Sequence, residues 1–236
     1  MKSLLVIIPA RSGSKGVKDK NIKILGGIPL LAWPIKAINA AKVRNQSTVI
    51  VSTDSAAYLA IASEFGVDGA SLRPERLSTD EASTSDVIGY HIEQEEKRGK
   101  LYEYVLVLEP TSPFTEARDI ERAVFYLESN SDTDSVVGIG KVKDAHPVFL
   151  NKITSEGFLV PYLDKSGANV RRQDVEDLFF YDGSLYLSRV EAFKKNMSFY
   201  GPRTYGLEMD SYKNLEIDDS DDFELAQFVI RRRYED

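Results

Sequence analysis

The stretch LLVIIPARSGSKGVKDKN, residues 4–21, decides the fold expected for this chain. Its first five residues are apolar and predict a buried strand, as found in parallel sheets. The segment that follows carries two glycines, two serines and four basic residues. Glycines let backbone N–H groups approach an anion, and basic side chains neutralise its charge. We therefore expect a phosphate-bearing ligand at the carboxyl end of the first strand.

This loop differs from two well-known phosphate-binding loops. Lys15 is followed by Gly16, so the spacing of a Walker P-loop is missing. Gly13 and Gly16 alone do not form the G-x-G-x-x-G pattern of dinucleotide-binding folds. The alternative is a solvated basic turn, but the position directly after a buried strand favours ligand binding.

Composition excludes several classes of protein. The 236 residues suit one large α/β domain, and the net charge of -7 argues against nucleic acid or an anionic membrane as partner. The absence of cysteine excludes disulfides, thiolate metal sites and thiol nucleophiles. No apolar run approaches the roughly 20 residues that span a bilayer, and the N-terminus shows no signal-peptide pattern. We expect a cytoplasmic protein.

Strand-like apolar runs alternate with helix-like segments along most of the chain. Strands are expected at residues 4–8, 48–52, 67–72, 104–108, 135–139, 178–188 and 205–209. Helices are expected at residues 29–42, 56–65, 86–98, 116–128 and 218–232. This alternation predicts an α/β fold with a mainly parallel sheet covered by helices on both faces.

The alternation lapses between residues 142 and 177. Two apolar stretches, 148–153 and 158–162, flank a Ser-Glu-Gly sequence and predict a hairpin. We therefore expect residues 1–236 to form a single domain with an arm at about residues 142–177. Such an arm could cover the site or pair with another subunit.

Polar clusters follow several of the expected strands, at residues 11–21, 52–55, 73–84 and 109–112. Ligands of open parallel sheets bind outside the carboxyl ends of the strands, so we expect these clusters to converge on one site. Each alone has a simpler explanation, such as a helix cap or a surface loop.

In this order the motifs resemble those of the acylneuraminate cytidylyltransferases, the CMP-sialic acid synthetases. The motifs are IPAR (8–11), GSKG (13–16), KN (20–21), STDS (52–55), RP (73–74), LSTD (77–80), PTSP (110–113), RQD (172–174), GSLY (183–186) and EID (216–218). The resemblance covers nearly the whole chain and is weakest at about residues 141–169. It implies a three-layer, Rossmann-like sheet of the nucleotide-diphospho-sugar transferase type, with a small dimerisation arm.

The resemblance also implies a reaction in which CTP and a nine-carbon 2-keto sugar acid give the CMP-sugar and pyrophosphate. Positioning and charge neutralisation dominate the catalysis of such a step. The residues matched to the triphosphate are Arg11, Ser14, Lys15 and Lys20. Of these, Arg11 and Lys15 best suit the charge that develops on the leaving group. The residues matched to cytosine and its ribose are Asn21, Arg73, Ala82 and Thr84.

An acidic pair near the end of the chain matches the metal site of the family. Asp218 matches the second metal-binding aspartate, and Glu216 stands where the first is usually Asp. On an extended segment both side chains point to one face, as a shared Mg²⁺ requires, and the ion could lower the pKa of the attacking hydroxyl. An acidic cluster at a helix start is the alternative, and we assign Asp219, Asp221 and Asp222 to it.

A further set of residues matches the sugar-acid pocket. The set is Glu109, Thr111, Ser112, Arg172, Gln173 and Asp182. Arg172 is the candidate for the sugar carboxylate, which favours a bidentate guanidinium, although Arg171 and Arg172 could also be an exposed pair. In the family this region lies beside an arm exchanged between two subunits, so the resemblance implies a homodimer through residues 142–177.

Two positions depart from the family pattern. Glu109 stands where Gln is usual, and Asp182–Gly183 replaces Asn–Gly. A carboxylate at position 109 would repel an anionic group or bind an amine or hydroxyl. Our hypothesis is therefore that the acceptor is a nonulosonic acid other than, or as well as, N-acetylneuraminic acid. The alternatives are a cytidylyltransferase for an eight-carbon ulosonate, a sugar 1-phosphate nucleotidyltransferase and a catalytically silent nucleotide-binding module.

Overall fold

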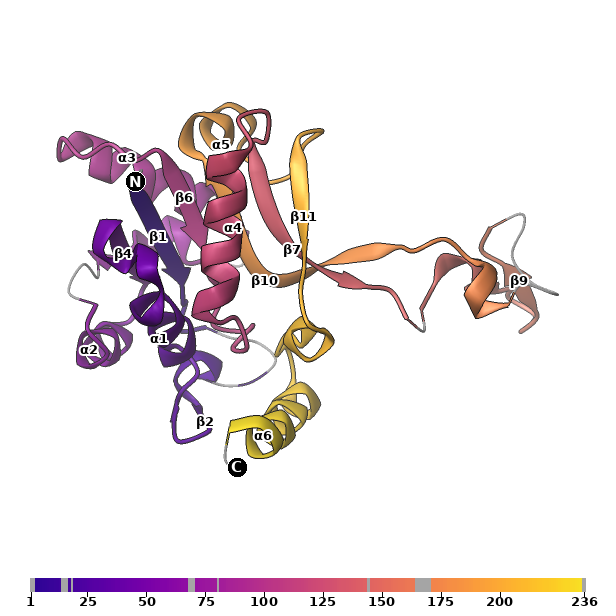
Figure 1. The fold of residues 1–236 in the computed structure, drawn as a ribbon. Helices are drawn as coiled ribbons and strands as arrows, with labels where there is room; N and C mark the ends of the chain where they lie inside the picture. Colours follow the sequence, from indigo (N-terminus) through magenta and orange to yellow (C-terminus); the bar gives the residue numbers. More distant parts are fainter. Residues whose placement is uncertain are drawn as a thin grey trace.

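The computed structural model describes residues 3–13, 17, 19–67, 71–79, 81–143, 145–163 and 171–234. Its centre is a seven-stranded sheet with the strand order β11-β7-β10-β6-β1-β4-β5 (Figure 1). The strands are β1 (Leu4–Pro9), β4 (Ser47–Thr53), β5 (Ser71–Leu72), β6 (Tyr104–Val107), β7 (Ser135–Lys141), β10 (Phe179–Arg189) and β11 (Thr204–Glu208). All neighbours pair in parallel except β10, which is antiparallel to β6 and β7. The predicted mainly parallel sheet is confirmed.

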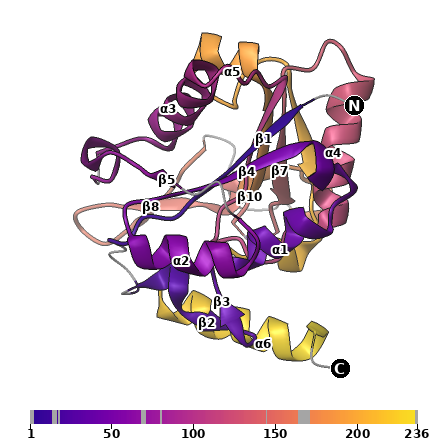
Figure 2. The ribbon, with the colours of Figure 1, turned by 90° about the vertical axis from the view of Figure 1, so that its left-hand side faces the viewer.

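Helices cover both faces of this sheet. One face carries α1 (Ala32–Ala40), α2 (Ala56–Glu64) and α4 (Ala117–Ser129), and the other carries α3 (Thr84–Lys97) and α5 (Val190–Asn196). Figure 2 shows the sheet between the two groups. The predicted three layers are therefore present. None of the helices in the described ranges has the length and apolar run needed to cross a membrane.

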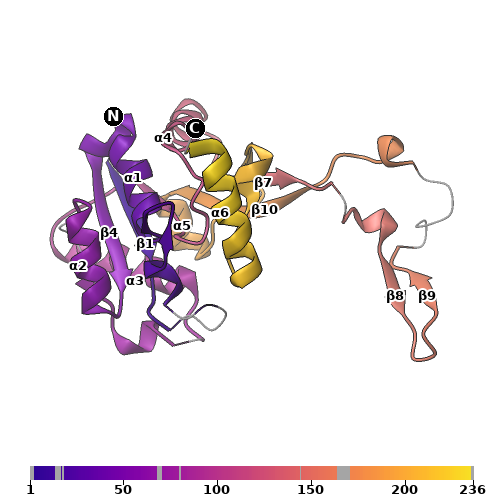
Figure 3. The ribbon, with the colours of Figure 1, turned by 90° about the horizontal axis from the view of Figure 1, so that it is seen from below.

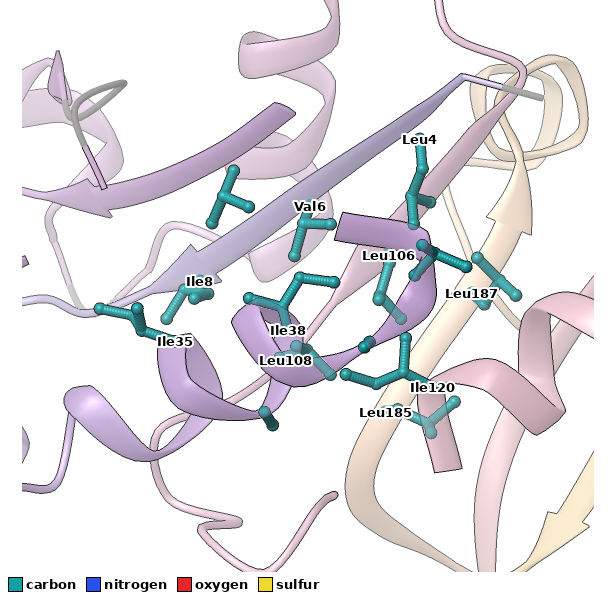
Figure 4. Packing of buried hydrophobic residues seen from close by; sticks show 14 of the residues in the cluster. Leu4, Val6, Ile8, Ile35, Ile38, Leu106, Leu108, Ile120, Leu185 and Leu187 are labelled. Carbon is teal, nitrogen blue, oxygen red and sulfur yellow. The ribbon is translucent and has the colours of Figure 1, made fainter. Parts of the chain in front are cut away.

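The alternation of side chains along β1 explains why it is buried on both sides. Leu4, Val6 and Ile8 pack against α1 and α4, as Figure 4 shows with Ile38 and Ile120. The intervening residues of β1 point to the opposite face and join the core beneath α3 and α5. Successive residues of a strand face opposite sides, so an uninterrupted apolar run is what a sheet covered on both faces requires.

A third apolar cluster closes the lower edge of the body. It joins α6 (Ser220–Tyr234) to a hairpin of β2 (Ile24–Leu25) and β3 (Ile28–Pro29). Leu25, Phe114, Ile217 and Phe223 are buried within it. Since Pro29 belongs to β3, the predicted helix 29–42 begins three residues later, at Ala32. This cluster brings the last segment of the chain back to the N-terminal loop.

Short 3₁₀ helices occupy several connections. They are η1 (Lys20–Ile22), η2 (Lys42–Gln46), η3 (Glu75–Leu77), η4 (Pro147–Phe149), η5 (Arg172–Asp174) and η6 (Ser211–Asn214). Of these, η1 lies at the end of the basic segment of the expected site, and η6 lies directly before its acidic segment.

Between β7 and β10 the chain leaves the body as a long arm (Figures 1 and 3). The arm carries the antiparallel pair β8 (Asn151–Ile153) and β9 (Leu159–Pro161), so the predicted hairpin is confirmed. Its apolar side chains are unusually open to solvent: Ile153, Phe158 and Leu159 are 73%, 70% and 67% exposed. The arm therefore presents an apolar surface that the body of this chain leaves uncovered.

Candidate active site

A cavity of about 440 Å³ opens at the carboxyl ends of the parallel strands. Its walls are formed by Pro9, Arg11, Lys20, Asn21, Arg73, Leu77, Thr79, Ala82, Thr84, Val87, Glu109, Pro110, Thr111 and Asp218. The predicted clusters 11–21, 73–84 and 109–112 all contribute to this wall. The remaining cluster, residues 52–55, contacts the basic loop. Asp54 accepts hydrogen bonds from the backbone N and Oγ of Ser12, at 2.8 and 3.0 Å.

The basic loop reaches the cavity through Arg11, Lys20 and Asn21. Asn21 Nδ2 donates to the carbonyl of Arg11 at 3.0 Å, which closes the loop on itself. Asp19 precedes η1 in the left-handed region, with φ 52°, and turns the chain so that Lys20 points inward. Ser14 and Lys15, both predicted to hold the triphosphate, lie outside the described residues.

Lys20 joins the two ends of the chain. Its Nζ donates to the carbonyl of Ile217 at 2.5 Å and to Asp218 Oδ1 at 3.3 Å. Lys20 is largely buried, whereas the Asp218 side chain is mostly exposed towards the cavity. The basic loop after β1 and the acidic segment before α6 therefore meet at one cavity, as a shared triphosphate site requires.

Arg73 also lines this cavity. It is 8% exposed, donates from Nη1 to the carbonyl of Leu77 at 3.2 Å and keeps an Nε donor without a partner. Burial lowers its pKa. Behind it, His91 Nε2 lies 2.7 Å from Ser52 Oγ, and burial followed by the charge of Arg73 lowers the pKa of His91 to about 4. Sequence reasoning did not connect this neutral histidine with the site.

Three carboxylates influence one another at this site: Glu109 and Asp218 line the cavity, whereas Glu216, the other predicted metal ligand, lies outside its described lining. Burial and then the charge of Glu216 raise the pKa of Glu109 to about 7, and burial and the charge of Asp218 raise that of Glu216. In the described ranges, no three His, Cys, Asp or Glu side chains are arranged to hold a metal ion by themselves. Protein atoms could therefore supply only part of a coordination sphere here.

The neighbouring aspartates belong to the start of α6 instead. Asp222 Oδ2 accepts from the backbone N of Asp218 and of Asp219, at 2.9 and 3.1 Å. In turn, Asp219 Oδ1 accepts from the backbone N of Asp221 and of Asp222. Their assignment to a helix-start cluster is confirmed, since these carboxylates satisfy free N–H groups of the first turn.

A glycine shapes the floor beside Glu216. Gly183 has φ +75°, and a Cβ there would lie 3.0 Å from Ser112 Oγ and 3.1 Å from Glu216 Oε2. Next to it, Asp182 is 2% exposed, and its Oδ1 accepts from the backbone N and Oγ of Ser184 at 3.0 and 2.6 Å. The structure therefore places Asp182 and Ser112 beneath the site, outside the described lining of the cavity.

A second cavity of about 210 Å³ adjoins the first. It is lined by Thr84, Ser85, Ile88, Val107, Glu109, Tyr186, Ser198, Phe199 and Tyr200. Thr84 and Glu109 belong to both cavities, so Glu109 stands at their junction. Phe199 and Tyr200 were missed by sequence reasoning because they follow the unpredicted helix α5 and form no motif. The described lining of this cavity contains no lysine or arginine.

Two predicted sugar-acid residues lie far from the cavities. Arg172 and Gln173 lie in η5, on the arm, well away from the sheet (Figure 3). Gln173 is exposed, and the side chain of Arg172 is outside the described part. Within one chain they cannot join Glu109 and Thr111.

Together these features define an α/β protein with a cavity lined by the cations Arg11, Lys20 and Arg73 and by the carboxylates Glu109 and Asp218. The family model for cytidylyltransferases matches residues 5–229, so the chain belongs to the cytidylyltransferase family. It is 35% identical over 221 residues to N-acylneuraminate cytidylyltransferase of Streptococcus agalactiae serotype V, covering 93% of this chain and 51% of that protein. It is 32% identical to CMP-N,N'-diacetyllegionaminic acid synthase of Legionella pneumophila, covering 98% of each chain.

This chain spans about half the length of the streptococcal relatives. Among solved structures, it resembles a CMP:2-keto-3-deoxy-manno-octonic acid synthetase complexed with CTP. The TM-score is 0.69 with 15% identity, over 98% of this chain and 99% of that one. This likeness confirms the nucleotide-diphospho-sugar transferase type of fold.

Proposed function

We propose that this protein transfers CMP from CTP to a nine-carbon 2-keto sugar acid and releases pyrophosphate. The observation that carries the proposal is the contact between Lys20 and Asp218 inside a cavity at the carboxyl edge of the sheet. It joins a cationic loop suited to a triphosphate with carboxylates suited to a metal. The similarity to N-acylneuraminate and legionaminic acid enzymes supports the same activity. A reaction that consumes CTP belongs in the cytoplasm.

In this reaction the anomeric oxygen of the acceptor bonds to the α-phosphorus of CTP. The bond from that phosphorus to the bridging oxygen breaks, pyrophosphate leaves with the electron pair, and the hydroxyl proton is released. Arg11, Lys15 and Lys20 neutralise the charge on the phosphates, and the hydroxyl group of Ser14 donates a hydrogen bond to them. Asn21, Arg73, Ala82 and Thr84 enclose the cytidine, where the unpartnered Nε of Arg73 is a donor for the base or ribose.

The acidic pair fits a magnesium ion. Glu216 and Asp218 repel each other, and a dication between them would relieve that repulsion. Mg²⁺ usually takes one or two carboxylates and completes its shell with water and substrate phosphates. A site with only two carboxylate ligands suits this ion, and among the described residues no group of three His, Cys, Asp or Glu side chains could hold a metal. When bound, Mg²⁺ supplies positive charge to the phosphates and the attacking oxygen.

The acceptor occupies the second cavity, with its hydroxyl directed past Glu109 towards the nucleotide. The carboxylate of a sugar acid needs a cation there, and the described lining offers none. We assign that role to Arg172 from the arm of a second copy. A bidentate guanidinium suits a carboxylate, and the arm of one chain extends away from its own cavity.

A homodimer would also cover the exposed apolar surface of the arm. An isolated two-stranded hairpin is only marginally stable in water. The side chains of Ile153, Phe158 and Leu159 are not buried against the body of their own chain. We therefore propose that two copies exchange arms. Light scattering after size-exclusion chromatography tests this: a mass of two chains supports it, and a monomer at micromolar concentration contradicts it.

Glu109 sets the class of acceptor. At the junction of the cavities, a carboxyl group accepts hydrogen bonds from an amine or hydroxyl better than the amide usual in the family. We therefore propose a nonulosonic acid other than, or as well as, N-acetylneuraminic acid. The alternative acceptor is an eight-carbon ulosonate. It is supported only by the similarity in fold to a synthetase structure that is 15% identical to this chain.

The test is pyrophosphate release from CTP with a panel of acceptors, with and without Mg²⁺. The panel holds N-acetylneuraminic acid, a legionaminic-type acid, an eight-carbon ulosonate and a sugar 1-phosphate. Asp218→Asn should abolish turnover, whereas Asp221→Asn, an exposed aspartate of the same helix start, should retain it. CTP binding without pyrophosphate release would instead indicate a silent nucleotide-binding module. Clear preference for N-acetylneuraminic acid would refute the acceptor hypothesis.

A further inference from the structure

Two acid-bearing segments meet at the proposed site although they repel each other. Residues 109–112 follow β6 and lead into α4, whereas residues 215–218 follow η6 and lead into α6. Glu109 and Asp218 line the same cavity, and like charges that face one cavity repel each other. Like charges do not gather unaided, so other contacts must hold these segments together.

Lys213, in η6, makes one set of those contacts. Its side chain is 0% exposed. Its Nζ donates to Glu116 Oε2 at 2.9 Å and to Asp119 Oδ2 at 2.5 Å. Both acceptors form the capping box at the start of α4, where Asp119 Oδ2 also accepts from the backbone N of Glu116 at 3.0 Å. Lys213 therefore ties η6 to the first turn of α4.

The carboxylates of Glu116 and Asp119 balance the charge of Lys213. Arg118 pairs with Glu116 at 2.9 Å and with Asp210 at 2.7 Å, so its cation adds to the network from the surface. A buried ammonium is tolerated only when it is fully paired, and removing one partner leaves an uncompensated charge. This network, the Lys213 joint, therefore links two elements that neighbour the site.

The joint lies next to both acidic segments. Lys213 stands three residues before Glu216, and Glu116 stands five residues after Thr111. Between the segments, the backbone N of Ile217 donates to the carbonyl of Thr111 at 2.8 Å. Besides this hydrogen bond, the segments are held by Lys20, which contacts Ile217 and Asp218, and by the apolar cluster that buries Ile217 with Phe114. The Lys213 joint adds a buried charged contact that fixes the chain only three residues before Glu216.

We propose that Lys213 is a positioning residue that holds the segment Glu216–Asp218 against residues 109–111. It presets the carboxylates for a divalent cation without touching substrate. The role in cation binding rests on the proposed function, whereas the positioning of the segment does not. The two can therefore be tested separately.

The test variant is Lys213→Met combined with Asp119→Asn. The amide oxygen of Asn can still accept the capping hydrogen bond, and Glu116 keeps Arg118, so no buried charge is left unpaired. The matched control is Glu95→Gln, which weakens another buried ion network, with Arg98 and Lys100, near the far end of α3. Thermal melting confirms that both variants are folded.

The first measurement is amide hydrogen exchange at Ile217 without metal or nucleotide. We expect exchange at least tenfold faster than wild type in the double variant, and unchanged exchange in Glu95→Gln. Wild-type exchange at Ile217 in the folded double variant would overturn the proposal, whatever the activity.

The second measurement is the Mg²⁺ concentration for half-maximal pyrophosphate release, beside CTP affinity in EDTA. We expect at least a tenfold rise in the Mg²⁺ requirement and less than a threefold change in metal-free CTP affinity. Faster exchange with an unchanged Mg²⁺ requirement would support the positioning role but remove the metal assignment from the proposed function.

Discussion

Replacing Glu109 by Gln should stabilise the folded protein above pH 7 but not at pH 4. In the folded state, burial and then the charge of Glu216 raise the pKa of Glu109 from 4.5 to about 7. The folded protein therefore binds a proton that the unfolded chain has lost between pH 4.5 and 7. Where the folded state binds more protons, stability falls as pH rises. Above pH 7 the wild type bears the full cost, and Gln, which never ionises, avoids it.

The magnitude follows from the two pKa values. The difference between 4.5 and about 7 is about 2.5 pH units, and each unit corresponds to about 1.4 kcal/mol, so the ionised carboxylate costs about 3 kcal/mol at pH 8. At pH 4 the two proteins should be equally stable, apart from effects of the amide itself. Between these limits the gap should open mainly from pH 5 to 7.

The assay is urea unfolding in EDTA at intervals between pH 4 and 8, since a bound cation would relieve the repulsion. Glu128→Gln, which removes the same charge from an exposed position on α4, is the control and should shift stability by less than about 0.5 kcal/mol at every pH. If the Glu109→Gln and wild-type curves stay parallel from pH 4 to 8, the carboxyl group is not desolvated beside Glu216. The reasoning about the acidic site would then be wrong.

Three further predictions follow from single contacts. Lys20→Met removes the cation that contacts Asp218, and kcat/KM for CTP should fall by roughly 10²-fold or more; a wild-type value would contradict its role. Gly183→Ala should lower the free energy of unfolding by about 1–2 kcal/mol, because φ is +75° and the methyl group would crowd Glu216; urea midpoints check this. His91 has its pKa lowered from 6.5 to about 4, so the wild type should lose up to about 3 kcal/mol of stability as pH falls from 6.5 to 4. His91→Gln should not show that loss, and an identical acid limb would refute the assignment.

Much of the sheet could be predicted because its signals are local. The parallel strands β1, β4 and β6 each contain a short apolar run, and β1 with its basic loop forms one continuous stretch. The direction of β10 could not be predicted in this way, because apolar content does not distinguish parallel from antiparallel pairing. Its direction depends on the arm, which returns the chain to the sheet from the opposite end.

The residues of the candidate site also fall into those that a local sequence signal predicts and those that it does not. Arg11, Lys20, Arg73 and Glu109 could be proposed from their place after strands, and the cavity contains them all. The second cavity could not be proposed from the sequence, because Tyr200 enters it from a loop that carries no motif. Nor does a buried lysine have a sequence signature, so Lys213 looks like any surface lysine until its partners are seen.

By itself the sequence determined the layers of the protein and a cationic turn at the end of the first strand, because both depend on residues that are neighbours in the chain. Only the tertiary structure decided that this turn would meet an acidic segment: Lys20 and Asp218 are 198 residues apart. Their contact depends on packing Ile217 and Phe223 against the N-terminal hairpin and on pairing Lys213 with α4. Both are long-range burial effects, in which each group is stabilised only once the whole fold has excluded water around it.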